Sequence, residues 1–241
     1  MEKNGLNFPD FRFSSDKPAL TDWKQIFKNR EQKKYSKKSV IVQQGQEVNY
    51  LYYIVSGLVE YTYTTDDGIQ ELLEILGDGN LFCLQPFFGG NPAVGSFVAL
   101  EDAIITIISC KELDYYINQD YNLAKELLVE FARVTGGLVR QIYTQTYDAE
   151  RRVEELICLL AEYRKEKRDH NKGIYVGLTQ EDLARIARTT RVTVTKALGE
   201  LRKYHLIETA YGGLLVRDLE GLKKILLEKE NKHYSQKAVS L

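Results

Sequence analysis

The sequence predicts an α+β fold in which a small β-barrel or roll is followed by one long helix, then by two short helices and a β-hairpin. Residues 35–109 are rich in β-branched and aromatic residues between regularly spaced glycines. Residues 121–147 carry an apolar stripe at helical spacing, and residues 178–216 change from short amphipathic helices to short strands. A chain of 241 residues, 44% of them hydrophobic, is long enough to form the roll and a second small domain.

The roll is predicted from four turn glycines, Gly45, Gly57, Gly68 and Gly79, which are separated by 12, 11 and 11 residues. This spacing equals about one strand plus one turn, repeated around a small barrel or roll. Asp67 before Gly68 is a hairpin signal of its own. The glycines therefore indicate fold and carry no chemistry.

The long helix is predicted over residues 121–147, and it would extend about 38 Å at 1.5 Å per residue. Such a helix is longer than a small roll can cover, so we expect a two-fold dimer contact along its apolar stripe. The alternative is a helix packed inside its own chain. The predicted dimer stripe consists of Leu127, Phe131, Val134, Leu138 and Ile142.

A domain boundary is predicted at Asp148, which can cap a new helix with Glu150 in the first turn. The charged stretch ending at Gly173 is expected to be a solvated loop. Residues 149–241 carry 19 basic and 14 acidic side chains, whereas residues 1–148 carry 14 and 20. The C-terminal part is thus the part to test for nucleic-acid binding.

Residues 178–203 predict two short helices with a tight connection. Thr179 with Asp182 forms a capping box for the first helix, and Thr189 or Thr190 caps the second. The small Ala184 permits a close helix crossing, as in a helix-turn-helix. The following residues 205–218 predict two strands around a Tyr-Gly-Gly turn, the wing of a winged helix. The inner positions are Leu183, Ala184, Ile186, Ala187, Val194, Ala197, Leu198 and Leu201.

The second short helix is predicted to read DNA. Between Arg185 and Lys203 there are six basic residues and one acid, Glu200, which suits a phosphate-binding face. The alternative is a basic amphipathic helix that is only a solvated surface. Near the helix start, cations can bind guanine or phosphate, and apolar side chains can contact the thymine methyl group. The predicted DNA-binding residues are Thr179, Gln180, Thr190, Arg191, Val192, Thr193, Thr195 and Lys196.

These parts, in this order, resemble the cyclic-AMP receptor protein and fumarate-nitrate reduction regulator superfamily of bacterial transcription factors. The resemblance covers residues 35–229 and rests on the glycine-spaced roll, the long helix and LTQEDLARIARTTRVTVTKAL. It implies a double-stranded, cupin-like β-roll of the cyclic-nucleotide-binding-domain type, a central dimerisation helix and a C-terminal winged helix-turn-helix. The predicted domains are 1–120 for effector sensing, 121–148 for dimerisation, 149–230 for DNA binding and 231–241 as a tail.

The departures from that family's pattern concern the effector. Members that bind cyclic nucleotides carry Gly-Glu-Leu and Arg-Ser-Ala stretches for ribose and phosphate. The corresponding stretches here, 83–85 (Cys-Leu-Gln) and 94–96 (Val-Gly-Ser), lack the acid and the cation, so we predict that cyclic AMP is not the effector. Residues 1–82 contain no cysteine, so we do not expect the iron-sulfur cluster of other members. No histidine precedes His170 in the sequence, so we do not expect a haem-binding sensor either.

We predict instead a small organic effector, held by apolar and aromatic side chains. Arg133 is the candidate partner for an anionic group on it. The loop and helix are similar in layout to the halogenated-phenol-responsive regulators of this superfamily, which favours an aromatic compound. The predicted effector-pocket residues are Phe82, Leu84, Gln85, Phe87, Gly95, Ser96, Arg133, Leu138 and Ile142.

The predicted function is an effector-responsive, homodimeric regulator that binds a palindromic operator on double-stranded DNA, with RNA polymerase as a further partner. Val192 stands where many relatives have a Glu that reads cytosine, so we expect a half-site richer in A·T pairs there. The alternatives are a ligand-independent regulator and a thiol switch at Cys83, Cys110 or Cys158. An enzyme on the roll is not expected, because residues 35–109 contain no histidine for a metal site.

The remaining expectations come from composition. The chain has no apolar run of about 18 residues and no signal-peptide pattern at its start, so we expect a cytoplasmic protein with no membrane partner. The three cysteines show no metal-type spacing, which predicts reduced thiols and no metal or other cofactor.

Overall fold

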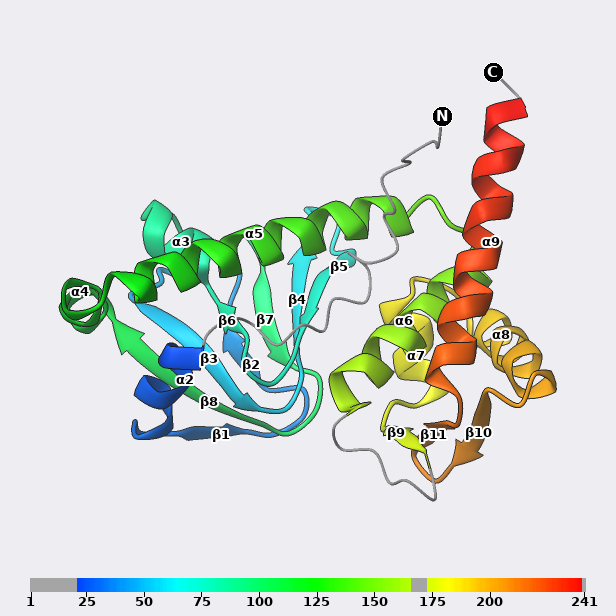
Figure 1. The fold of residues 1–241 in the computed structure, drawn as a ribbon, viewed down its shortest axis with the longest axis horizontal. Helices are drawn as coiled ribbons and strands as arrows, with labels where there is room; N and C mark the ends of the chain where they lie inside the picture. The colour runs from blue at the N-terminus through cyan, green and yellow to red at the C-terminus, as the bar shows by residue number, and fades with distance from the viewer. Residues whose placement is uncertain (1–20, 166–172, 240–241) are drawn as a thin grey trace. The chain divides into compact units, whose positions relative to one another are not determined.

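The computed structural model describes residues 21–165 and 173–239, which form two compact units (Figure 1). The first unit ends at Gln141 and the second begins at Ile142. The first contains the strand-rich region with most of the long helix, and the second contains the short helices and the hairpin. The parts of the predicted domains that fall on residues 1–20, 166–172 and 240–241 lie outside the described residues.

The first unit is a roll of two four-stranded antiparallel sheets, as predicted. Its strands are β1 (Lys33–Tyr35), β2 (Val40–Val42), β3 (Tyr50–Ser56), β4 (Val59–Thr64), β5 (Gln70–Leu76), β6 (Leu81–Phe82), β7 (Ser96–Ala99) and β8 (Ala103–Ser109). One sheet has the order β1-β8-β3-β6 and the other the order β2-β7-β4-β5. Neighbouring strands thus come from both halves of the roll sequence, which closes the structure around one interior.

The four predicted turn glycines lie in turns with positive φ angles of 81°, 105°, 82° and 89°. Gly57 also lies close to another backbone segment, because an added Cβ atom would stand 2.6 Å from the carbonyl oxygen of Asp102. A side chain there would be both strained and obstructed. The prediction that these glycines serve the fold is confirmed.

Aromatic side chains fill the interior between the sheets. Tyr52 stacks on Phe82 with ring centroids 5.0 Å apart, and Tyr61 stacks on Phe97 at 4.3 Å. The rings of Phe82 and Phe97 are 4.9 Å apart and join the two pairs. Stacked and tilted rings contribute about 0.5–1.5 kcal/mol per pair beyond burial of their area. The roll therefore has a continuous aromatic core.

Three shorter helices accompany the roll: α2 (Thr21–Lys28), α3 (Leu84–Gly89) and α4 (Cys110–Gln119). The indole of Trp23 in α2 is fully buried and donates a hydrogen bond to the carbonyl oxygen of Leu123, 3.0 Å away. Leu123 belongs to the long helix α5 (Tyr121–Thr144), which runs along the roll in Figure 1. A second core cluster thus joins α2, β3 and α5.

The predicted dimer stripe on α5 requires a correction. Leu127 is only 4% exposed inside this second core, and Phe131 and Val134 pack against the same cluster. A side chain enclosed by its own roll offers no surface to a second copy, so the prediction is wrong for Leu127. Leu138 and Ile142, the other two members, are 36% and 66% exposed.

A different face of α5 is open to solvent. Its exposed residues recur at alternating intervals of three and four, the spacing of coiled-coil seams. Leu128 is 66% exposed and Val139 is 44% exposed, so this face presents apolar side chains to water. The members of this exposed seam are Tyr121, Lys125, Leu128, Ala132, Thr135, Val139 and Ile142.

The second unit is a winged helix-turn-helix. Its elements are α6 (Ala149–Arg164), β9 (Ile174–Val176), α7 (Gln180–Ile186), α8 (Arg191–Lys203), β10 (Ile207–Ala210), β11 (Gly213–Val216) and α9 (Leu219–Val239). Asp148 caps α6, because its carboxylate accepts a hydrogen bond from the backbone N–H of Arg151. Both the predicted cap and the predicted hairpin are confirmed.

Two elements of this unit were absent from the sequence prediction. β9 pairs with β11 and makes the hairpin a three-stranded sheet, although its three residues follow the charged stretch expected to be a loop. α9 continues through Val239, so helical backbone extends into the predicted tail 231–241. None of the described helices combines the length and the apolar character needed to cross a lipid bilayer.

Candidate nucleic-acid interface and effector site

The outward face of α8 is formed as the helical spacing predicts. Arg191, Val192, Thr195 and Lys196 are exposed, and the Val192 side chain is 79% accessible. The opposite face fills the core of the unit, which fixes the orientation of the helix. All the predicted inner positions of α7 and α8 are buried: Leu183, Ala184, Ile186, Ala187, Val194, Ala197, Leu198 and Leu201.

Caps fix where the two helices begin. The Thr179 hydroxyl accepts from the backbone N–H of Asp182, and the Asp182 carboxylate accepts from the backbone N–H of Thr179, which is a complete capping box. Thr190, one of the two predicted alternatives, caps α8 by accepting from the backbone N–H of Thr193 at 3.2 Å. Each such cap stabilises a helix by about 1 kcal/mol.

Several predicted DNA-binding side chains already have partners inside the unit. The hydroxyls of Thr190 and Thr193 lie 3.0 Å apart, and Thr193 is half-buried. The hydroxyl of Thr195 lies 3.1 Å from Oε1 of Gln180 and 2.9 Å from the carbonyl oxygen of Arg191. These bonds tie the start of α7 to α8. The chemically open groups at the start of α8 are therefore Arg191 and Val192.

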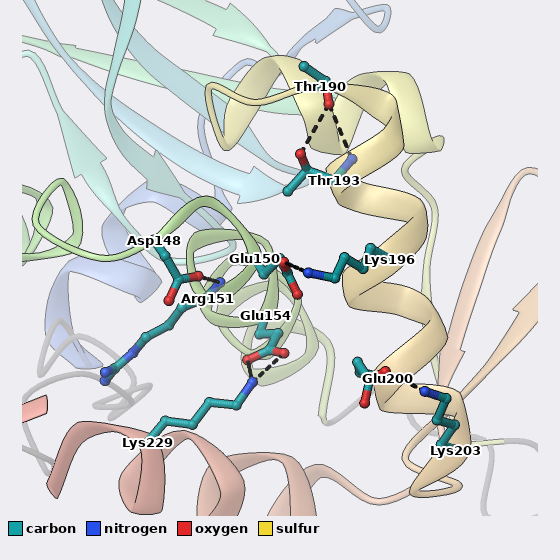
Figure 2. A network of polar contacts seen from close by, with 10 residues as sticks. All are labelled: Asp148, Glu150, Arg151, Glu154, Thr190, Thr193, Lys196, Glu200, Lys203 and Lys229. Carbon is teal, nitrogen blue, oxygen red and sulfur yellow. Dashed lines mark hydrogen bonds and ion pairs between the residues drawn. The ribbon is translucent and has the colours of Figure 1, made fainter. Parts of the chain in front are cut away.

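Lys196 is paired with an acidic residue from another helix. Its Nζ lies 2.5 Å from Oε1 of Glu150 in the first turn of α6, and Figure 2 shows the two side chains extended toward each other. The Glu150 carboxylate raises the pKa of Lys196. A second pair on α8, between Lys203 and Glu200, has the same 2.5 Å separation.

Arg152 connects the segment before α6 to the turn between α7 and α8. Its guanidinium donates to the carbonyl oxygens of Tyr147, Ala187 and Arg188 at 2.8, 3.0 and 3.0 Å. Arg188 occupies the left-handed region with a φ of 51°, where its carbonyl can face this donor. Sequence reasoning missed Arg152, because its partners are backbone carbonyl oxygens. Every residue has such an oxygen, so the sequence does not show which ones will meet Arg152.

A cavity of about 340 Å³ separates α8 from the wing. Arg191 and Arg202 line it from the helix, and Gly212 and Gly213 line it from the hairpin. At the tip of the hairpin the Tyr211 side chain is completely exposed, while its carbonyl oxygen accepts a hydrogen bond from the hydroxyl of Tyr175 at 2.9 Å. The wing thus has a fixed tip beside the recognition helix.

Within the described residues, the predicted effector-pocket residues have different surroundings. Phe82 belongs to the core between the sheets, whereas Leu84 belongs to the cluster beneath α5, which Phe87 also contacts. Gln85 is exposed. Leu138 is exposed on α5, and Ile142 belongs to the other unit. These side chains serve two cores and the surface.

Gly95 and Ser96 have structural partners. A Cβ atom added to Gly95 would stand 2.3 Å from the carbonyl oxygen of Thr62 and 2.8 Å from the ring of Tyr61. The Ser96 hydroxyl accepts from the backbone N–H of Gln44 at 2.9 Å. Both residues therefore hold β7 against neighbouring backbone, and Gly95 leaves no open space for a ligand.

We expect Gly95→Ala to destabilise the roll by about 1–3 kcal/mol, because the obstructing group is backbone in the adjacent strand and cannot turn aside. Thermal unfolding followed by circular dichroism measures the effect. Gly199→Ala in the helix Arg191–Lys203 is the control, since its added Cβ meets no atom within 4 Å and its φ lies outside the left-handed region. A Gly95→Ala protein as stable as the natural one would show that the close approach at Gly95 tolerates a side chain.

Arg133 joins α5 to the roll through two buried carboxylates. Its Nε and one terminal nitrogen each lie 2.8 Å from the carboxylate of Glu130, and its other terminal nitrogen lies 3.4 Å from Glu74. Glu130 also accepts from the backbone N–H of Leu81 at 3.2 Å. Gly137 makes room for this arrangement, because an added Cβ atom would stand 2.6 Å from the Glu74 carboxylate.

Sequence reasoning missed both acids of this cluster. Glu130 lies within the buried stripe of α5, three residues after Leu127 and three before Arg133, and is 1% exposed. A single charge inside an apolar stripe, with an opposite charge one turn away, is a signal that could have found it. Glu74 is 4% exposed and gives no such signal, because its strand carries another acid, Glu71, three positions earlier.

The cysteines differ in exposure. Cys83 and Cys158 are buried, and burial raises the pKa of each thiol. Cys110 is exposed at the start of α4. Among the described residues, no group of three or more His, Cys, Asp or Glu side chains is arranged to hold a metal ion.

Comparison with known proteins bears on both units. Residues 32–120 match the cyclic nucleotide-binding domain family, and residues 151–225 match the Crp-like helix-turn-helix domain family. The transcriptional regulator LdrP of Thermus thermophilus is 26% identical over 202 residues, which cover 80% of this chain and 95% of LdrP. The cAMP-activated global transcriptional regulator CRP of Pasteurella multocida is 25% identical over 185 residues, 76% of this chain and 88% of that protein.

Solved structures agree with these matches. The crystal structure of a CRP-family transcriptional regulator from Thermus thermophilus superimposes with a TM-score of 0.63 at 26% identity, covering 80% of this chain and 95% of that one. The roll, the long helix and the winged helix-turn-helix thus occur in the order found in these relatives. The relatives are transcription regulators and not enzymes. The chain belongs to the cyclic-AMP receptor protein and fumarate-nitrate reduction regulator superfamily of DNA-binding transcription regulators.

Proposed function

We propose that this regulator is a homodimer that senses a small organic molecule other than cyclic AMP and binds a palindromic operator. The proposal that the protein binds an operator rests on the side chains at the start of α8. There Arg191 and Val192 are exposed on a helix whose opposite face is locked into the core. Such a helix enters the major groove with its N-terminal residues against the base edges.

The side chains of α8 favour a particular kind of half-site. Arg191 can donate two hydrogen bonds to guanine O6 and N7, and the apolar Val192 can contact the methyl group of thymine. We therefore propose an A·T pair opposite Val192 and a G·C pair opposite Arg191. Two copies related by a two-fold axis would read half-sites about 34 Å apart.

The dimer is proposed to form through the exposed seam of α5, defined above. Leu128, Val139 and Ile142 supply apolar surface at coiled-coil spacing, and the small Ala132 between them permits close approach of a second helix. Two-fold symmetry makes such a contact self-complementary, since each residue meets the same face of its partner. Burial of these side chains would remove the exposed apolar strip from water.

We propose that the effector is not a cyclic nucleotide, because two stretches of the roll depart from the family's pattern. Where relatives hold its phosphate with an arginine, this chain has Val94, Gly95 and Ser96, and Gly95 lies against the backbone of β4. Leu84, where relatives bind the ribose with a glutamate, is buried in the core under α5. Neither stretch supplies the charge-assisted hydrogen bonds that a cyclic phosphate needs.

Arg133 is the proposed anchor for an anionic group on the effector. Its two 2.8 Å contacts with Glu130 are short, whereas the contact with Glu74 is longer at 3.4 Å. The Glu74 contact is thus the weaker one, and an incoming carboxylate or phenolate could replace it. Exchange at this point would change how α5 is held to β5.

The experiment that tests this function is selection of operators from random duplexes by the full-length protein, with and without a panel of phenols and aromatic acids. Recovery of palindromes with A·T-rich half-sites one helical turn apart would support the proposal. Recovery of non-palindromic sites would overturn the homodimer, and identical recovery with every compound would leave a ligand-independent regulator.

We expect Arg133→Gln to weaken binding of a responsive anionic compound at least about tenfold, because a charge-assisted contact to the ligand is lost. The only tryptophan of the chain, Trp23, is hydrogen-bonded to α5 through the carbonyl oxygen of Leu123, so its fluorescence follows titration of the protein with the compound. Arg30→Gln is the matched control, since Arg30 also pairs with a carboxylate, that of Glu112, but lies outside the proposed site. Unchanged affinity in Arg133→Gln would exclude Arg133 as the anchor.

Burial reduces the number of cysteines that could act as a thiol switch. Cys83 and Cys158 are buried with raised pKa values, so few thiolates are present at neutral pH, and the thiolate is the reactive form. An oxidant would first meet Cys110. Mass spectrometry after mild oxidation, together with operator affinity of Cys110→Ser, decides this alternative.

A further inference from the structure

The two lysines of α8 are both paired, but with acids of different origin. Lys203 pairs with Glu200 one turn away on the same helix, at the end of α8 away from its N-terminus. Lys196 pairs with Glu150, which is 46 positions earlier in the sequence and belongs to α6 (Figure 2). Only the second pair joins the outward face of the recognition helix to another element.

The geometry of the Lys196–Glu150 pair favours exchange. The Lys196 side chain is 68% exposed, and Glu150 is 32% exposed. An ion pair this open is worth little in water, because solvent and salt screen it and two long side chains are restrained. The 2.5 Å contact nevertheless directs one of the three ammonium donors at Glu150 in the free protein. The negative charge of Glu150 therefore opposes a phosphate or a guanine edge that approaches the same ammonium.

We propose that Glu150 is an affinity-determining residue that acts through Lys196, as an internal competitor of DNA for the lysine ammonium. The inference rests on the proposed function, since it requires α8 to lie on DNA. Glu150 itself need touch no nucleotide. Within the described part of the chain Arg191 forms no ion pair. Of the two cations on the outward face of α8, Lys196 therefore faces an internal competitor for DNA and Arg191 does not.

The competition predicts a definite cost. A carboxylate held at the lysine competes with each DNA contact of that lysine, so removal of the acid should tighten binding about two- to fivefold, the equivalent of an exposed ion pair. The salt dependence should change as well. A lysine that meets phosphate without first losing a carboxylate adds up to about 0.9 to the slope of log affinity against log salt.

The place of Glu150 makes the competition relevant to regulation. It lies two residues after Asp148, the cap of α6, in the segment that follows the long helix along the chain. Any rearrangement of the first turn of α6 would alter the Lys196–Glu150 separation directly. The recognition helix thus carries one cation whose availability depends on a neighbouring element.

The test compares Glu150→Gln, Lys196→Ala and the double variant with the natural protein, on a selected operator duplex and over a range of salt. Glu200→Gln is the matched control, because it removes the same charge from the other Lys–Glu pair of α8. Circular dichroism checks that the first turn of α6 persists, since an acid there also stabilises the helix dipole. Fluorescence anisotropy of labelled DNA gives the affinities.

The inference expects a two- to fivefold gain and a steeper salt slope for Glu150→Gln, a smaller gain for Glu200→Gln, and no gain from Glu150→Gln when Lys196 is already alanine. Equal gains in both Gln variants, or a gain that survives in the double variant, would overturn it and indicate plain repulsion of DNA by an acid. Normal operator binding by both Lys196→Ala and Arg191→Ala would instead overturn the assignment of α8 to DNA.

Discussion

Leu128→Glu is expected to convert the proposed dimer into monomers and to lower operator affinity at least about 100-fold. Leu128 is the one leucine of the α5 seam and is 66% exposed, and in a two-fold contact it would meet the seam of the partner helix. The substitution removes two apolar side chains from the interface and places two carboxylates there, each costly to bury. Sedimentation or light scattering gives the oligomeric state, and anisotropy gives the affinity.

The control for this prediction is Tyr115→Glu. Tyr115 is 61% exposed on α4 and lies outside the seam, so the same charge on a similarly open apolar residue should leave the dimer intact. A Leu128→Glu protein that remains dimeric would exclude the seam. The buried stripe offers a further comparison, because Leu127→Glu should unfold the roll rather than release a dimer.

The two stripes of α5 show what helical periodicity alone cannot decide. Leu127 and Leu128 are neighbours in sequence, and each belongs to a series of residues spaced at intervals of three and four. The series that continues to Phe131 and Val134 faces the roll, whereas the series that continues to Val139 faces solvent. The choice depends on the shape of the roll surface, which is set by residues distant in sequence.

The short helices of the second unit were predictable almost residue by residue, because their signals are local. Thr179 and Asp182 form the predicted box, and Thr190 forms the predicted cap. Caps act within four residues, so the sequence contains all the information they need. Lys196 was predicted to face outward and does, but its pairing with Glu150 depends on the packing of α6 beside α8.

The effector region was the least predictable part. Phe82, Leu84 and Gly95 are close in sequence and have the composition of a ligand pocket, yet their environments are filled by other parts of the roll. Whether an aromatic side chain lines a hollow or fills a core depends on its partners across the sheets. The buried acids Glu74 and Glu130, which hold Arg133, are likewise defined only by tertiary contacts.

Arg191→Ala is expected to weaken binding to the selected operator about 5- to 150-fold, the loss that follows removal of one bidentate contact to a guanine. Arg191 is the first residue of α8, is exposed and stands free of ion pairs within the described chain, so its guanidinium meets DNA without an internal exchange. Fluorescence anisotropy with the operator and with a scrambled duplex measures the loss.

The ratio between those two duplexes decides what Arg191 does. A base contact predicts a large loss on the operator and a small one on the scrambled duplex, whereas a phosphate contact predicts equal losses and a shallower salt slope. Lys203→Ala removes the same charge near the other end of α8 and should affect both duplexes little. Full operator binding by Arg191→Ala would mean that the start of α8 does not lie in the major groove. A loss confined to the operator would instead identify Arg191 as the residue that reads a G·C pair in each half-site.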